Sequence, residues 1–281
     1  MPDLHASLSA APSGRATPVW FDSLAYCHEK LLGGDQVPWA SPGELTAFTG
    51  KAQGMFRSDA LLVNLAELYA WRTAVESDLR TAMGARTRVA YPLRTLLADE
   101  KARTVAVDAV SASSGVSGGT PVVLTMPSPS RWLSTSAEQA GQPAAPPDPD
   151  SADTAAMYIA DFLRIFATAP VDGLVLDEGP TSATDLTRAD AYRPVLNVSE
   201  HYKWPVLICS ETAAWPHGPI PGVAGWVGSS PPDRAGGTWG LLATDDFWSG
   251  TDPVGAPDLV LAVVPAEADP EPVMARVRAL R

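Results

Sequence analysis

The sequence has few cysteines and few basic residues, and each shortage excludes a class of protein. Its two cysteines, Cys27 and Cys209, lie far apart in 281 residues. Disulfides therefore do not hold the fold, and a cytoplasmic location is the simplest interpretation. Only 20 lysines and arginines stand against 32 acidic residues, which gives a formal net charge of −12. This balance argues against nucleic acid or an anionic membrane as the partner.

Long apolar runs and targeting segments are also missing. The N-terminus lacks a basic segment followed by an apolar one, so no signal peptide is predicted. The apolar run 259–264 is far too short to span a bilayer. The glycine-rich stretches 115–119 and 236–237 precede strands instead of following them, and they match no nucleotide-binding motif. A small-molecule substrate is therefore the expected partner, while composition leaves the oligomeric state unknown.

Apolar strand-like runs that alternate with helical patterns predict an α/β fold. The eight strand candidates are 18–21, 88–91, 121–126, 173–178, 205–210, 223–228, 239–244 and 259–264. Eight strands separated by helices favour a (β/α)8 barrel of the TIM type over an open sheet. Only about ten residues, 229–238, join two late strands, and a full crossover helix needs at least that many. A distorted or incomplete barrel therefore stays an alternative.

The same patterns predict the domain organisation. We expect residues 1–16 to be a flexible N-terminal tail and 17–281 to be a single barrel domain. The apolar spacing over 58–83 predicts one long helix. The low-complexity stretch 134–152 is rich in Pro, Ala and Asp, and it predicts a loop or lid after a strand.

Polar residues follow several predicted strands at their carboxyl ends, where parallel α/β folds carry their active sites. These residues are Asp22, Arg94, Ser128, Arg131, Asp177, Glu178, Cys209, Glu211, Asp245 and Asp246. Side chains alternate along a strand, so only one of Asp177 and Glu178 can face a pocket, and we favour Asp177 together with Val175. Carboxylates at such a rim can serve as acid and base, or they can cap helices and pair with arginines.

We assign the candidate site from these residues and the loops beside them. The predicted catalytic residues are Asp177, Glu211 and His217. The predicted substrate-binding residues are Ser128, Arg131, Asp245, Trp215 and Trp248. His217 lies in the rigid loop 215–219 and is the best placed of the four histidines for proton transfer. Trp215 and Trp248 follow strands, where aromatic side chains often line apolar pockets.

Cys209 has three interpretations. It can be a small buried hydrophobic residue, as free cysteines commonly are. It can be a zinc ligand together with Glu211 and His217, which follow it at compatible spacing. It can also be a nucleophile, although the sequence around it shows no recognisable histidine–carboxylate arrangement that would activate the thiol.

Several segments together resemble the barrel superfamily of uroporphyrinogen decarboxylase and cobalamin-independent methionine synthase. Leu124-Thr-Met-Pro-Ser-Pro129 is similar to its strand followed by a Pro-Ser/Gly-Pro turn, and Thr17-Pro-Val-Trp-Phe21 is similar to the decarboxylase's first strand. A predicted helix over 153–169, followed by Val171 to Glu178, resembles the methionine synthase segment ending in Asp-Glu-Pro. The resemblance covers about residues 87–265 and implies a barrel with transferase or lyase chemistry. It also implies that Asp177 contacts the amino group of a substrate.

The resemblance extends to a zinc site only in part. The strand 205–210 is similar to one whose His-x-Cys supplies two zinc ligands, but Leu207 stands at the histidine position. No glutamate ends the strand 223–228, and no cysteine follows Cys209. Three of the four implied ligands are therefore missing. The arginine-bearing segment of the decarboxylase is replaced by Asp22 to Cys27, which removes the clamp for a polycarboxylate substrate.

Three hypotheses follow from these observations. The first is a cytoplasmic small-molecule enzyme, methyltransferase-like or decarboxylase-like, that uses carboxylates at the rim. The second is a non-catalytic or degenerate barrel that acts as a binding protein. The third is a zinc-dependent alkyltransferase with a rebuilt site at Cys209, Glu211 and His217. No cofactor is assigned, and zinc enters only through the third hypothesis.

Overall fold

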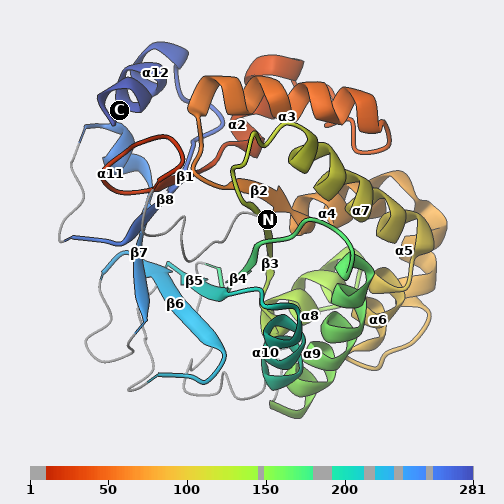
Figure 1. The fold of residues 1–281 in the computed structure, drawn as a ribbon. Helices are drawn as coiled ribbons and strands as arrows, with labels where there is room; N and C mark the ends of the chain where they lie inside the picture. The colour runs from red at the N-terminus through yellow and green to blue at the C-terminus, as the bar shows by residue number, and fades with distance from the viewer. Residues whose placement is uncertain are drawn as a thin grey trace.

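Eight parallel strands form one nearly closed barrel with helices packed on its outside, so the predicted (β/α)8 fold is confirmed (Figure 1). The computed structural model describes residues 11–144, 149–179, 192–211, 219–230, 237–250 and 256–280. The strands are β1 (Val19–Asp22), β2 (Leu61–Asn64), β3 (Val122–Pro127), β4 (Gly173–Asp177), β5 (Val206–Ser210), β6 (Val223–Gly228), β7 (Thr238–Ala243) and β8 (Leu259–Val263).

The helices follow the strands along most of the chain. They are α2 (Leu24–Leu32), α3 (Pro42–Phe56), α4 (Leu65–Val75), α5 (Ser77–Gly84), α6 (Tyr91–Leu97), α7 (Glu100–Gly115), α8 (Pro129–Gln139), α9 (Pro149–Leu163), α10 (Arg193–Tyr202), α11 (Asp245–Trp248) and α12 (Pro270–Ala279), with a 3-10 turn η1 (Arg164–Phe166) after α9. None of the helices in the described ranges is long and apolar enough to cross a membrane.

The strand register decides which side chains point into the barrel. Parallel neighbours pair Trp20 with Leu261 and Val175 with Leu207, and these residues belong to one buried cluster inside the barrel. Two residues further along each strand, Asp22 pairs with Val263 and Asp177 with Cys209. Because side chains alternate with a period of two, these residues share the inner face. The barrel therefore has an apolar floor and a mouth that carries polar groups.

The space between barrel and helices is filled by a second core. Tyr69, Trp132, Phe162 and Phe166 form a chain of edge-to-face contacts with centroid distances of 5.5–6.1 Å. Each such pair adds about 0.5–1.5 kcal/mol beyond the burial of its area. These rings come from α4, α8, α9 and η1, so they fix the helices that follow β2 and β3 against the barrel wall.

The ladder of hydrogen-bonded strands is open between β1 and β2, and side chains bridge this seam. The Asp59 N–H donates to the Val19 carbonyl at 2.9 Å, and the Asp59 carboxylate accepts from the Val19 N–H at 2.9 Å. Arg15 pairs with Asp59 at 3.0 Å, and both side chains are almost fully buried. Ser58 accepts from the Phe21 N–H at 2.9 Å and donates to the Ala60 carbonyl at 2.6 Å.

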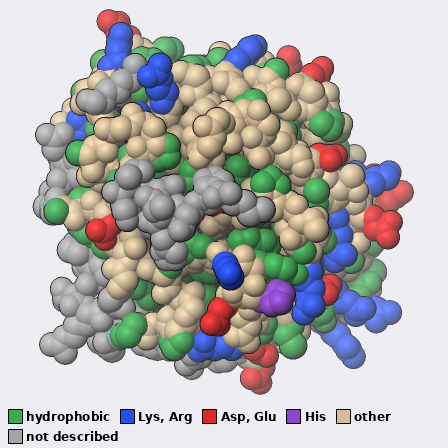
Figure 2. Space-filling view, in the orientation of Figure 1, with side chains coloured by type: hydrophobic (Ala, Val, Ile, Leu, Met, Phe, Trp, Pro, Cys, Tyr) green, Lys and Arg blue, Asp and Glu red, His purple; other side chains and the backbone are tan. Residues whose placement is uncertain are grey.

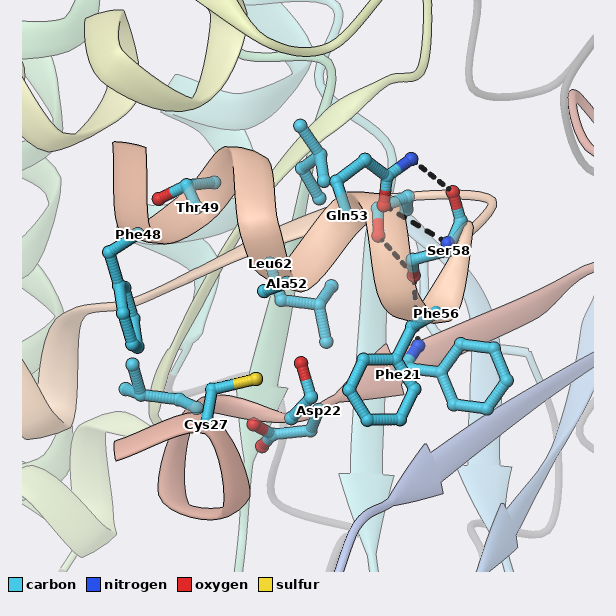
Figure 3. Close-up of a pocket in the computed structure, with 14 residues that line it drawn as sticks. Phe21, Asp22, Cys27, Phe48, Thr49, Ala52, Gln53, Phe56, Ser58 and Leu62 are labelled. Atoms are coloured by element: carbon cyan, nitrogen blue, oxygen red, sulfur yellow. Dashed lines mark hydrogen bonds between the residues drawn. The ribbon is translucent and has the colours of Figure 1, made fainter. Parts of the chain in front are cut away.

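A small cavity of about 70 Å³ lies at this seam. Figure 3 shows Thr49, Ala52 and Gln53 of α3 on one side of it and Asp22 and Cys27 on the other. Hydrogen bonds of 3.0 Å join the Gln53 side chain to the backbone of Ser58 in both directions. Helix α3 therefore covers the gap that strand pairing leaves open.

The structure corrects two predicted elements near the N-terminus. The second strand is Leu61–Asn64, within the predicted helix 58–83, and the helices there are α4 and α5. The candidate strand 88–91 is a turn that leads into α6, and Val89 is 41% exposed. Pro92 stands in the first turn of α6 instead of after a strand. A valine so exposed has no place in a strand of a parallel barrel, since both faces of such strands are covered.

The predicted loop 134–152 is shorter in the structure. Helix α8 continues to Gln139, and α9 begins at Pro149. Residues 145–148 between them lie outside the described part. The predicted helix 153–169 accordingly starts four residues earlier and ends at Leu163, where η1 takes over.

Candidate functional site

A cavity of about 230 Å³ opens at the mouth of the barrel, where the carboxyl ends of the strands meet. Its described lining residues come from seven of the eight strands, all but β6, and from the segments that follow them. The polar and charged members are Asp22, Asn64, Glu67, Thr125, Arg131, Asp177, Cys209, Glu211 and Thr244. The remaining lining is apolar and rests on the barrel floor. The cavity is therefore an open mouth with ionisable groups above an apolar base.

Asp22 has the most perturbed carboxyl group at the mouth. The pKa of Asp22 is raised from 3.8 to about 6, chiefly by burial and to a smaller extent by the charges of Glu67 and Asp177, while the hydrogen bond from the Leu24 N–H opposes the rise. A pKa near 6 lets the carboxyl both bind and release a proton close to neutral pH. Asp22 also lines the seam cavity and a groove beside the mouth, so it stands where three cavities meet.

Asp177 faces the mouth and holds Arg131. Its carboxylate accepts from the Arg131 guanidinium, and its other oxygen accepts from the Gly179 N–H at 2.8 Å. The backbone of Gly179 has a positive φ of 76°, and a Cβ there would lie 2.8 Å from the guanidinium carbon of Arg131. A glycine is thus needed for the arginine to reach its partner. Both Asp177 oxygens are engaged, so this carboxylate orients the Arg131 side chain.

Cys209 and Glu211 lie at the same mouth but do not form a metal centre with the described residues. Burial raises the pKa of the Cys209 thiol well above its ordinary value, and the carboxylates of Asp177 and Glu211 add to the effect. Leu207 points inward beside Val175 and offers no ligand atom. Across the described ranges, no three His, Cys, Asp or Glu side chains come together as metal ligands. The donor atoms of the described residues therefore do not make a zinc site, and His217, the third predicted ligand, lies outside them.

A larger groove of about 480 Å³ adjoins the mouth between α2 and α4. It shares Asp22, Asn64, Glu67 and Val263 with the mouth cavity, so the two form one continuous cleft. Its further lining is largely apolar and aromatic, with Leu24, Val37, Trp39, Ala70 and Trp71, and it includes His28. Val263, at the end of β8, is 39% exposed. An exposed apolar surface beside polar groups is typical of a ligand-binding cleft.

The structure brings together four of the predicted site residues and separates others. Asp177, Glu211, Arg131 and Cys209 line the mouth. Ser128 is buried behind the barrel wall, where it caps α8 through the Arg131 N–H at 3.3 Å and donates to Glu178 at 2.9 Å. His217 and Trp215 lie outside the described residues.

Asp245 and Trp248 lie away from the mouth cavity. Asp245 is exposed in the first turn of α11. The Trp248 ring packs 6.1 Å from the Phe21 ring, and its indole N–H donates to the Val263 carbonyl at 2.6 Å. Both residues follow β7, but Asp245 is exposed to solvent and the Trp248 ring packs against the core between barrel and helices. Neither is among the residues that line the mouth.

Sequence reasoning missed Asn64, Glu67 and Thr125. Asn64 ends β2 and Glu67 lies in the first turn of α4, within a segment that was predicted to be one long helix. Their spacing carried a signal, because Asn-x-x-Glu is a helix N-terminal capping pattern, and the Asn64 side chain accepts from the Glu67 N–H at 3.1 Å. Thr125 lies on the inner face of β3, and its buried hydroxyl oxygen has no hydrogen-bond partner among the described residues.

Arg94 lies apart from the mouth, in an outer groove between α6 and α9. Its neighbours there include Arg86, Arg88, Tyr91 and Tyr158. Figure 2 shows basic side chains gathered at the lower right, over α5 and α6. Arg94 was expected at the rim because 88–91 was assigned as a strand. Because 88–91 is a turn and not a strand, Arg94 lies on α6 and faces the outside of the barrel.

Comparison with known proteins gives no assignment for this chain. No family model matches it, and no curated protein matches it.

Proposed function

We propose that this protein is a small-molecule enzyme that works by proton transfer at the barrel mouth, with Asp22 as general acid and base. The observation that carries the proposal is the raised pKa of Asp22, about 6, at the meeting point of three cavities. A strongly perturbed acid in a cleft is a candidate catalytic group. The position at a strand's carboxyl end agrees with where barrel enzymes hold their catalytic residues.

Arg131 has a binding role in this proposal. Asp177 holds one side of the guanidinium, and the side chain of Arg131 keeps 32% of its surface exposed at the mouth. An arginine has five N–H donors, so some stay available for an oxygen atom of the substrate. Asp177 is then a positioning residue, and Glu211 adds a second carboxylate at the mouth. Transferase or lyase chemistry, as the superfamily resemblance implies, is compatible with this arrangement.

The alternative of a non-catalytic barrel predicts a mouth filled by the protein's own aromatic side chains. Among the described lining residues of the mouth there is no tryptophan, and the volume of about 230 Å³ leaves room for a small ligand group. Both features favour a working site over a degenerate one.

The test compares turnover by the wild-type protein and two variants in a screen of small-molecule substrates followed by mass spectrometry. Asp22→Asn keeps the shape and the acceptor oxygen but cannot transfer the proton, so we expect kcat to fall about 10²- to 10⁴-fold. The control Asp246→Asn removes an exposed carboxylate outside the cleft and should leave kcat unchanged. Full activity of the Asp22→Asn variant would refute the role of Asp22.

A further inference from the structure

We infer that the cleft selects an organic cation with an apolar or aromatic body, such as an arylalkylamine. The inference rests on the proposed function, because it names the substrate class of the same site. The charged head would lie among the carboxylates of the mouth, and the body would lie along the groove between α2 and α4. Three independent features of the described cleft support this orientation.

The first feature is the charge of the mouth. Asp22, Glu67, Asp177 and Glu211 line it, and Arg131 is the only lysine or arginine of the described lining. Asp177 already neutralises Arg131 through their ion pair. The described lining therefore leaves a net negative charge, and the carboxylates of Glu67 and Asp177 act on Asp22, whose pKa is raised mainly by burial and in smaller part by these two charges. An ammonium group placed there would relieve this repulsion.

The second feature is an unused hydrogen-bonding group. The Thr125 hydroxyl lies on the inner face of β3 beneath the mouth, and its oxygen is buried without a partner among the described residues. A buried hydroxyl without a partner is costly, so an N–H donor from a ligand would be favourable at this position. This group points to a ligand independently of the carboxylates.

The third feature is the composition of the groove. It continues directly from the mouth through Asp22, Asn64, Glu67 and Val263. The Trp71 indole N–H donates to the Gln36 side chain at 3.3 Å, which leaves the ring as an apolar wall of the groove. A groove of about 480 Å³ is large enough for an aromatic ring system and its linker.

The experiment measures binding of three probes of nearly equal shape by isothermal titration calorimetry at pH 7.5. Tryptamine carries an ammonium group, tryptophol carries a neutral hydroxyl, and indole-3-propionate carries a carboxylate. We expect tryptamine to bind at least about 10-fold more tightly than tryptophol, and indole-3-propionate to bind most weakly. Ethylamine, which lacks the ring, should bind more weakly than tryptamine because it leaves the groove empty.

Two variants assign the effect to the two parts of the cleft. Glu67→Gln removes one charge at nearly constant shape, and it should weaken tryptamine about 3- to 10-fold while leaving tryptophol unchanged. Glu44→Gln removes a charge from α3 outside the cleft and is the matched control. Ala70→Trp places an indole in the groove and should weaken tryptamine and tryptophol alike. Circular dichroism and thermal unfolding verify that each variant folds.

The outcomes separate this inference from the proposed function. Equal or tighter binding of the neutral or anionic probe would overturn the inference, and so would binding of no probe at millimolar concentration. An equal effect of Glu67→Gln and Glu44→Gln would also overturn it, since it would reflect only the overall charge. None of these results bears on the catalytic role of Asp22, which depends on the turnover of the Asp22→Asn variant.

Discussion

Replacement of Asp22 by asparagine should stabilise the protein at neutral pH. In the folded state the pKa of this carboxyl is about 6, while its ordinary value is 3.8. The folded state therefore holds the proton more tightly than the unfolded state between these two values. The stabilising contribution of the protonated Asp22 carboxyl to the free energy of unfolding is retained at low pH and is lost as the pH rises from about 4 to about 6. Above pH 6 the wild-type protein carries the full cost of a buried charge.

The magnitude follows from the size of the shift. One pKa unit corresponds to about 1.4 kcal/mol, so the shift of Asp22 corresponds to about 3 kcal/mol. This is an upper limit, since Asp22 keeps partial contact with solvent. Asparagine has nearly the same volume and can still accept from the Leu24 N–H. The variant Asp22→Asn should thus gain up to about 3 kcal/mol at pH 7.5 and almost nothing at pH 4.

The assay is urea unfolding followed by tryptophan fluorescence at pH 4, 5, 6 and 7.5. The decisive quantity is the difference in the free energy of unfolding between variant and wild type, because other carboxylates titrate in both proteins. Asp246→Asn is the control and should show no such pH-dependent gain. A difference that stays constant with pH, or a variant less stable than wild type at pH 7.5, would refute the reasoning. Stabilisation together with loss of turnover would mark Asp22 as a residue kept for function.

The remaining predictions concern the seam and the thiols. Asp59→Ala leaves the Arg15 charge buried without its ionic partner, so the free energy of unfolding should fall by about 3–5 kcal/mol. Urea unfolding of variant and wild type measures this loss. A loss below about 1 kcal/mol would contradict the stabilising role of the ion pair. The double variant Asp59→Leu with Arg15→Met removes both charges and should recover much of that loss. Burial raises the pKa of the Cys27 thiol to about 11 and that of Cys209 well above its ordinary value. A disulfide exchange reagent at pH 8 should therefore label both thiols slowly in the folded protein and rapidly in urea, and fast labelling of the folded protein would contradict their burial.

The barrel could be predicted because the sequence shows its middle strands clearly. The runs that form β3, β4 and β5 are apolar on both faces and end in polar residues or a turn, and the structure places them as neighbours in that order. Strand alternation indicated that only one of Asp177 and Glu178 could face the pocket, but it did not decide which; the structure places Asp177 on the inner face. Glu178 instead lies buried behind the wall, where it accepts from the Tyr192 hydroxyl at 2.8 Å.

The second strand could not be found by periodicity. Leu61, Leu62 and Val63 continue the apolar spacing of the helix that follows, and a strand of four residues is too short to show its own period. Missing this strand hid Asn64 and Glu67, and with them the groove beside the mouth. The raised pKa of Asp22 could not be predicted either, since it depends on burial and on carboxylates brought from distant segments.

The open seam has a consequence for the order of folding. In the described sheet β1 is hydrogen-bonded to β8, which lies far from it along the sequence. Contacts between segments so distant in sequence carry a high loop-closure cost and form late. Asp22 ends β1, and β8 is the strand that pairs with β1 in the described sheet, so the proposed proton-transfer group gains its full support when β8 has docked. A chain interrupted before β8 would hold most of the barrel, but its Asp22 would lack the neighbouring strand that fixes its position.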